Sequence, residues 1–151
     1  MLYIVLSVVL FAIDQLTKLA TVKVFSEGDS QIIINGILSF SRHHNTGGPW
    51  SIFDSFPQIF VIMTILILIA EIFIFKKYPL KHTISKLSCS LINAGAIGNL
   101  VDRVFRGYVV DMIDVDFINY PTFNFADCCI VVGCILMCVY VIFIDREQKM
   151  N

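Results

Sequence analysis

Four long apolar stretches dominate the sequence and restrict what the chain can fold into. They run from about residue 1 to 25, 57 to 75, 82 to 105 and 125 to 144. An α-helix needs roughly 20 largely apolar residues to cross the hydrocarbon of a bilayer. The sequence therefore predicts an all-α membrane protein, a bundle of four transmembrane helices that forms a single domain over residues 1–151.

The overall composition also favours lipid over water. Hydrophobic residues make up 57% of the 151 residues and charged residues 15%, against roughly 45–50% and about 25% in soluble domains. A domain of this size leaves much of its surface exposed, so this much apolar surface is unsuited to water. The net charge of −1 lacks the basic excess that nucleic-acid binding requires, and we expect no nucleic-acid partner.

The third apolar stretch is the most polar of the four, because it contains Asn99 and Asp102 among other polar residues. It also carries the small residues Ser90, Ala94 and Gly98 at every fourth position. Small residues at this spacing let a neighbouring helix approach closely within a membrane. We therefore expect this helix to be the buried one of the bundle.

A small β-sheet is predicted between the first two helices, in about residues 28–54. There, β-branched residues flank Asn35-Gly36, a dipeptide typical of tight hairpin turns. We expect this sheet outside the hydrocarbon, near the membrane interface, where aromatic side chains gather. The aromatic residues close to it are Trp50, Phe53 and Phe56.

A second non-helical stretch, between the third and fourth helices, is expected on the same side as the sheet. Its residues 114–122 are polar and contain a proline, so they have little to pack against. Segments with few packing contacts open easily and often serve as lids. We predict a mobile lid there.

The distribution of lysine and arginine predicts the orientation. An even number of spans places both termini on one side, and the more basic side faces the cytoplasm. The loop between the second and third helices contributes Lys76, Lys77 and Lys81, and the tail adds Arg146 and Lys149. We expect both termini in the cytoplasm and the sheet outside.

The first helix is expected to stay in the mature protein, because no basic residue precedes it and no A-x-A site follows it.

Charged side chains inside the apolar stretches are costly, at about 2.5–3.5 kcal/mol near the bilayer centre, and usually mark a functional site or an internal pair. Asp14 and Lys18 lie four residues apart, hence on one helix face. Their pairing alone favours a structural role. Glu71 lies about one turn from Lys76 and Lys77, and we expect it to extend towards the cytoplasmic interface.

The third helix ends in a polar stripe made of Gly95, Asn99, Asp102 and Arg103. Their spacing places them on one face that points into the bundle. Asp102 beside Arg103 is consistent with mutual neutralisation or with function. Arg103 and Asn99 point more strongly to function, because a guanidinium and an amide can hold a polar peptide backbone.

Two further acids, Asp111 and Asp127, bracket the segment between the third and fourth helices. Asp127 has a structural explanation, because Asn124 three residues earlier completes a helix capping box. Asp111 lies among apolar neighbours and would be desolvated without a partner.

If these two carboxyl groups meet, they cannot both stay ionised, and they share a proton. Such a pair supplies an acid and a base that can hydrolyse a peptide bond through a bound water molecule. The dipole at the start of the fourth helix favours ionised Asp127 as the base.

Other functions remain open on these residues alone. A small proton-coupled transporter or channel also uses intramembrane charges, although its acids would be spread through the depth of the bundle. A non-enzymatic assembly or chaperone subunit is a further alternative. We expect no metal or cofactor, because the five cysteines form no C-x-x-C and lie in apolar runs, where they serve as packing residues, and the three histidines lack ligand spacing.

Five motifs together resemble one known family. DQLTK (14–18), NTGGPWS (45–51), GAIGNLVDR (95–103), GYVVDMID (107–114) and FNFAD (123–127) occur in the order and spacing of the lipoprotein signal peptidases, or signal peptidase II. The resemblance implies a four-helix aspartic peptidase of the bacterial cytoplasmic membrane, with its site near the extracytoplasmic face. It implies cleavage of prolipoproteins just before the cysteine that bears a diacylglyceryl group. The implied partners are this lipid-modified substrate and membrane lipid, and we expect a monomer.

By motif position, the resemblance implies that Asp111 and Asp127 are the catalytic pair. The implied polar residues around the pair and the substrate are Asp14, Lys18, Asn45, Gly95, Asn99, Arg103 and Asn124. We expect mainly structural roles for Lys18 and for Asp102, which we add to this supporting set. One departure from the family's usual NTGAAFS is Gly48-Pro49-Trp50, where Pro49 fixes a backbone angle and removes a donor.

Overall fold

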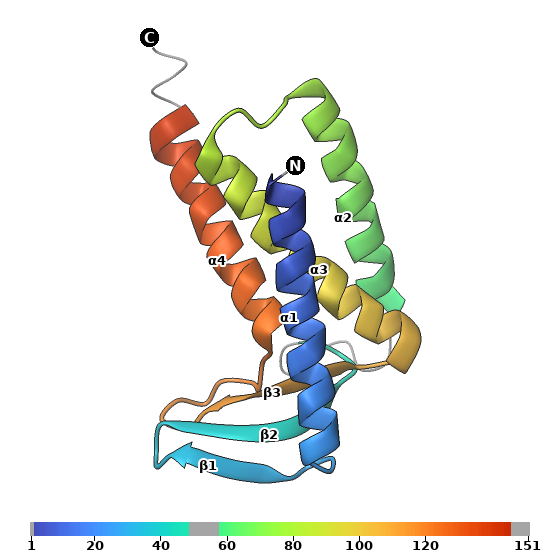
Figure 1. The fold of residues 1–151 in the computed structure, drawn as a ribbon, viewed down its shortest axis with the longest axis vertical. Coiled ribbons are helices and arrows are strands. Elements are labelled where there is room, and N and C mark those ends of the chain that lie inside the picture. The colour runs from blue at the N-terminus through green and yellow to red at the C-terminus, as the bar shows by residue number, and fades with distance from the viewer. Residues whose placement is uncertain (1, 49–57, 146–151) are drawn as a thin grey trace.

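The structure, a computed structural model, describes residues 2–48 and 58–145. A small sheet lies at one end of the molecule beside the last turns of α1, and the helices extend away from it towards the other end (Figure 1). The helices are α1 (Leu2–Val24), α2 (Gln58–Lys77), α3 (Thr83–Arg106) and α4 (Phe125–Val139), which continues into the π-helical turn η2 (Tyr140–Asp145). The strands are β1 (Ser30–Ile34), β2 (Leu38–Asn45) and β3 (Val109–Val115).

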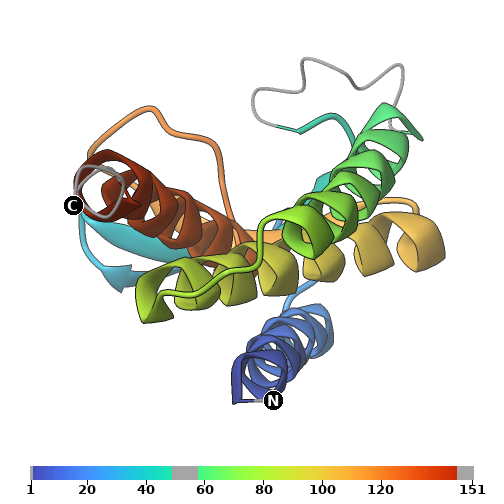
Figure 2. The same cartoon turned by 90° about the horizontal axis from the view of Figure 1, so that it is seen from above.

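The four helices follow the four predicted apolar stretches. Among the described residues, three helical segments are long and apolar enough to cross a membrane: Tyr3–Val24, Gln58–Lys77 and Phe125–Ile144. α3 is 24 residues long but is more polar, as its sequence predicted. It lies in the middle of the bundle, with α1, α2 and α4 packed around it (Figure 2). The prediction that this helix is the buried one is confirmed.

Small residues allow α3 to approach its neighbours closely, as predicted. On the side of α1, the Ser90 hydroxyl donates a hydrogen bond to the Tyr3 carbonyl at 3.0 Å. On the side of α4, the Ser88 hydroxyl donates to the Gly133 carbonyl at 2.6 Å. A Cβ atom at Gly95 would collide with the carbonyl oxygen of Ala126. Glycine at this position therefore permits direct backbone contact between α3 and α4.

The three strands form an antiparallel sheet in the order β1-β2-β3. The β1–β2 hairpin is the one that Asn35-Gly36 predicted, and Gly36 has the positive φ of 70° that such a turn requires. The Arg42 guanidinium of β2 donates to the Phe25 carbonyl at 3.0 Å, just beyond the last residue of α1. This contact attaches the sheet to the end of that helix.

The third strand was not predicted. β3 begins shortly after Gly107, whose left-handed backbone (φ 81°) ends α3. Its first four residues, 109–112, are all buried, so the strand lacks the alternation of polar and apolar residues that marks a half-exposed strand. In the register of the sheet, His43 of β2 lies opposite Asp111 of β3.

α2 is the least embedded helix: none of its twenty residues is buried. Glu71, which we expected to extend towards the cytoplasmic interface, has a partner on α3. It accepts a hydrogen bond from the Asn93 amide of α3 at 2.9 Å, because a cross-helix partner satisfies a half-buried carboxylate within an apolar bundle.

Some expectations fall on residues outside the described ranges, and they stay predictions. These residues are Pro49, Trp50, Phe53, Phe56, Arg146 and Lys149. The five cysteines are free thiols, and Cys89 and Cys129 are buried between the helices.

Replacing Gly95 with leucine should separate α3 from α4 and destabilise the protein. The side chain would meet the Ala126 carbonyl and the Ile130 side chain, and overpacking of this kind costs about 1–3 kcal/mol. Thermal unfolding in detergent measures the loss. Val104→Leu, at a position of the same helix that is 56% exposed, is the matched control and should unfold like the parent. Equal unfolding temperatures for the two variants would contradict this packing.

Candidate active site

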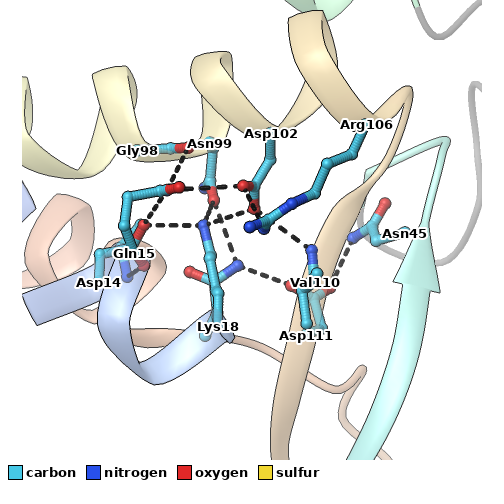
Figure 3. Close-up of polar contacts among 12 residues, drawn as sticks. Asp14, Gln15, Lys18, Asn45, Gly98, Asn99, Asp102, Arg106, Val110 and Asp111 are labelled. Atoms are coloured by element: carbon cyan, nitrogen blue, oxygen red, sulfur yellow. Dashed lines mark hydrogen bonds and ion pairs between the residues drawn. The ribbon is translucent and has the colours of Figure 1, made fainter. Parts of the chain in front are cut away.

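Polar side chains gather where the helices meet the sheet (Figure 3). They come from α1, α3, β2, β3 and the start of α4, elements that are far apart in the sequence. Most of them are buried, which is costly unless each polar atom finds a partner. The buried members are Asp14, Lys18, Asn99, Asp102, Asp111 and Asn124.

The ammonium of Lys18 is the centre of this group and is fully buried. It lies 2.9 Å from Asp14 and 3.0 Å from Asp102, and it donates to the Asn99 side-chain oxygen at 2.9 Å. An ammonium has three donors, and these three acceptors satisfy them. The predicted Asp14–Lys18 pair therefore exists, as part of a larger set of charges.

Both acids beside Lys18 have further partners. Asp14 accepts a hydrogen bond from the backbone amide of Ala126 at 3.0 Å, near the start of α4. Asp102 pairs with Arg106 at 2.8 Å, one turn further along α3. We call Asp14, Lys18, Asp102 and Arg106 the polar frame. The charges of its two acidic and two basic side chains balance. The polar frame joins α1 to α3 and to the start of α4.

Two asparagines connect the polar frame to the two remaining acids. The Asn99 amide donates to Asp127 at 2.8 Å. The Asn124 amide donates to Asp111 at 2.6 Å and to the Asn99 oxygen at 3.2 Å. A continuous chain of hydrogen bonds thus runs from Lys18 to both carboxyl groups.

Asp127 has both the capping role and the site position that its sequence suggested. Its backbone amide donates to the Asn124 side chain at 3.0 Å, and its carboxylate accepts from the Asn124 backbone at 3.2 Å, which completes the capping box. One carboxylate oxygen is used by the cap and the other by Asn99. The start of α4 therefore fixes the position of this side chain.

Asp111 is buried in β3, with 1% of its surface exposed. Its second oxygen accepts a hydrogen bond from the Asn45 amide at 2.9 Å. Burial, and then the negative charge of Asp127, raise the pKa of Asp111 to about 7, against the opposing effect of the hydrogen bonds from Asn45 and Asn124. Asp111 therefore holds a proton at a pH where an ordinary carboxyl group has lost it.

The two acids, which we call the carboxyl pair, line one cleft of about 540 Å³. Most of its lining is apolar and comes from α2, α3 and α4, with Ile67 and Ile130 among the residues. The Arg103 guanidinium also lines the cleft and lies 4.8 Å from the centre of the Phe60 ring. The cleft thus combines an apolar trough between helices with an acid–base pair at the end near the sheet.

The structure divides the predicted site residues into two groups. Asn45, Asn99, Arg103, Asp111 and Asp127 line the cleft. The other five lie behind it: Asp14, Lys18, Gly95, Asp102 and Asn124, which hold the elements together.

Sequence reasoning missed some residues of the site. Arg106 lies four residues after Asp102, a helical spacing that could have identified the pair. Gln15, which donates to Asp14 at 3.1 Å and to the Gly98 carbonyl at 3.2 Å, carries no comparable signal. Its role becomes visible only when α1 and α3 are side by side.

Apolar helices long enough to span a membrane, together with a buried Asp111 and a partly exposed Asp127 that line one largely apolar cleft, define a membrane protein equipped for acid–base chemistry. The family model of signal peptidase (SPase) II matches residues 6–143 of this chain. The chain therefore belongs to the signal peptidase II family, and it is a peptidase.

Individual relatives match over nearly their whole length. The chain is 37% identical to the lipoprotein signal peptidase of Enterococcus faecalis over 147 residues, which cover 97% of this chain and 91% of the relative. It is 38% identical to that of Lactiplantibacillus plantarum over 148 residues, with coverage of 98% and 99%. Two solved structures of bacterial membrane enzymes are each 35% identical to this chain. The first has a TM-score of 0.87, and the match covers 97% of this chain and 90% of that structure's chain. The second has a TM-score of 0.85, with coverage of 94% and 93%.

Replacing Lys18 with methionine should strongly destabilise the protein. The change leaves Asp14 and Asp102 buried side by side without the ammonium between them, and removing one member of a buried ionic group costs about 3–5 kcal/mol. Thermal unfolding in detergent measures the effect. Adding Asp14→Asn should restore part of the stability, because Arg106 then balances Asp102. An unchanged unfolding temperature in Lys18→Met would show that the frame does not hold the fold.

Proposed function

We propose that this chain is an aspartic endopeptidase that cleaves the signal peptide from diacylglyceryl-modified prolipoproteins, on the N-terminal side of the lipid-modified cysteine. The observation that carries the proposal is the joint anchoring of Asp111 and Asp127 by Asn124 and Asn99 at the end of an apolar cleft. The curated relatives are named lipoprotein signal peptidases, which supports this substrate class.

In the proposed mechanism, Asp127 is the base and Asp111 the acid. Ionised Asp127 takes a proton from a water molecule held between the two carboxyl groups, and the water oxygen attacks the carbonyl carbon of the scissile bond. Asp111 gives its proton to the carbonyl oxygen, which forms a neutral tetrahedral diol. When the C–N bond breaks, Asp127 passes its proton to the departing amine, and a diol hydroxyl returns a proton to Asp111.

The cleft suits the chemistry of this substrate. A signal peptide and the acyl chains of the lipid are apolar, and the walls formed by α2, α3 and α4 offer them an apolar surface. Arg103 and Asn99 lie in the same cleft, where their donors can hold the polar carbonyl groups of the substrate backbone.

We propose that α3 is the fourth span and that the carboxyl pair lies near the extracytoplasmic face. α1 begins and η2 ends at the end of the bundle away from the sheet (Figure 1). Lys76 and Lys77, in the last turn of α2, supply the basic residues that mark the cytoplasmic side. A membrane position of this kind brings the scissile bond to the interface, where water is available.

Replacing either member of the carboxyl pair with asparagine should abolish cleavage of a lipid-modified precursor by the purified protein. Each substitution removes a proton donor or acceptor while nearly preserving shape, and loss of a general acid or base lowers rates by about 10²–10⁴-fold or more. Asp116→Asn is the matched control, because Asp116 is an exposed acid just beyond β3. Retained cleavage in Asp111→Asn or in Asp127→Asn would remove the mechanism.

The rate of cleavage should fall as the pH rises through about 7, because Asp111 then loses the proton that it donates. The charged groups that act on Asp111 are Asp127 and, more weakly, Lys18, while Asn45 donates a hydrogen bond that favours its ionised form. Asn45→Ala removes that bond, so the pKa of Asp111 rises and the alkaline fall moves to higher pH. The pH dependence of kcat/KM, which reports the pKa values of the free enzyme, measures this shift.

Asn93→Ala is the matched control, since it removes an amide that binds Glu71 away from the carboxyl pair. Its pH profile should keep the position of the parent profile. An alkaline limb that does not move in Asn45→Ala would contradict the assignment of Asp111 as the acid.

A further inference from the structure

A second hollow opens beside Asp111, on the side of the sheet and of the loop before α4. It has a volume of about 280 Å³, several times the roughly 30 Å³ that one water molecule occupies in the liquid. We call it the outer cavity. It shares Asn45, Gly48, Asp111 and residues 120–122 with the cleft, and it adds His43 and Asn119. Asp111 therefore lies at the junction of two hollows of different character.

The outer cavity is polar where the cleft is apolar. His43 reaches it from β2, where it lies directly opposite Asp111 in the sheet register. Asn119 reaches it from the loop that follows β3. Neither residue lines the cleft between the helices. A bound peptide that extends past Asp111 would therefore meet different side chains in the two hollows.

A peptide that is cut at Asp111 must extend to both sides of it. The signal peptide and the lipid are apolar and match the cleft, whereas the residues after the cysteine belong to a polar chain that continues into water. We propose that the outer cavity binds the residue that immediately follows the lipid-modified cysteine, with His43 and Asn119 as specificity-determining residues. This inference rests on the proposed function.

The charges around the outer cavity predict which residue it accepts. Asp111 lines it, and Asp114 lies behind its wall, where it accepts a hydrogen bond from Thr122. Among the described residues that line it, none is a lysine or an arginine. Because the proposed mechanism keeps Asp111 protonated, the negative charge near the cavity comes from Asp114 and Asp127. An acidic substrate residue would meet that charge without a fixed cation in the lining, so the cavity should favour a small or neutral polar residue over an acidic one.

The test compares two lipid-modified substrates that differ only in the residue after the cysteine, which is aspartate in one and serine in the other. The measured quantity is the ratio of their kcat/KM values. His43→Lys and Asn119→Lys each add a cation to the outer cavity, and each should raise the aspartate-to-serine ratio about two- to fivefold, as expected for a partly exposed ion pair. The matched control is Gln31→Lys, which adds the same charge to exposed β1, and its ratio should not change.

Two results would overturn the inference. One is an unchanged aspartate-to-serine ratio in both cavity variants. The other is an equal rise of that ratio in Gln31→Lys, because the effect would then come from added positive charge anywhere on the sheet. Because His43 and Asn119 stand on different elements, misfolding of one variant leaves the other as the test. Failure of the parent protein to cleave either substrate would instead refute the proposed function.

Discussion

The fold of this protein around its site depends on one buried ammonium group. Lys18 of α1 lies between Asp14 and Asp102 and donates to Asn99. Moving such charges out of water costs several kcal/mol per ion, so they are tolerated only together and in good geometry. α1 and α3 are thereby held at a fixed depth relative to each other, and the helix that carries the most polar residues is retained in the centre of an apolar bundle.

The hydrogen bonds that begin at Lys18 also fix the positions of the two carboxyl groups of the site. Asn99 receives a hydrogen bond from Lys18 and donates one to Asp127, while Asn124 begins α4 and holds Asp111. The carboxyl groups of Asp111 and Asp127 thus have little freedom, because the asparagines that hold them are held in turn by other residues. Burial and the neighbouring charge of Asp127 raise the pKa of Asp111 to about 7, and this difference between two identical side chains underlies the proposed acid and base roles.

The sequence predicted those features that depend on local patterns. Helix positions followed from apolar stretches, the first hairpin from Asn35-Gly36, and the start of α4 from the Asn124–Asp127 capping box. β3 was missed because its buried face leaves no alternation to detect. The Gln15 contacts and the cross-helix partner of Glu71 depend on how helices far apart in the sequence pack, which no local pattern encodes.

Infrared spectroscopy of the purified protein as a function of pH tests the central claim most directly, because protonated and ionised carboxyl groups absorb at different frequencies. The account predicts one carboxyl group that keeps its proton in mildly acidic buffer and loses it with a midpoint of about 7. Its band should vanish in Asp111→Asn. Ionisation of both members of the pair at pH values well below that midpoint, or persistence in Asp111→Asn of the band that titrates at about 7, would contradict a proton shared between these two side chains.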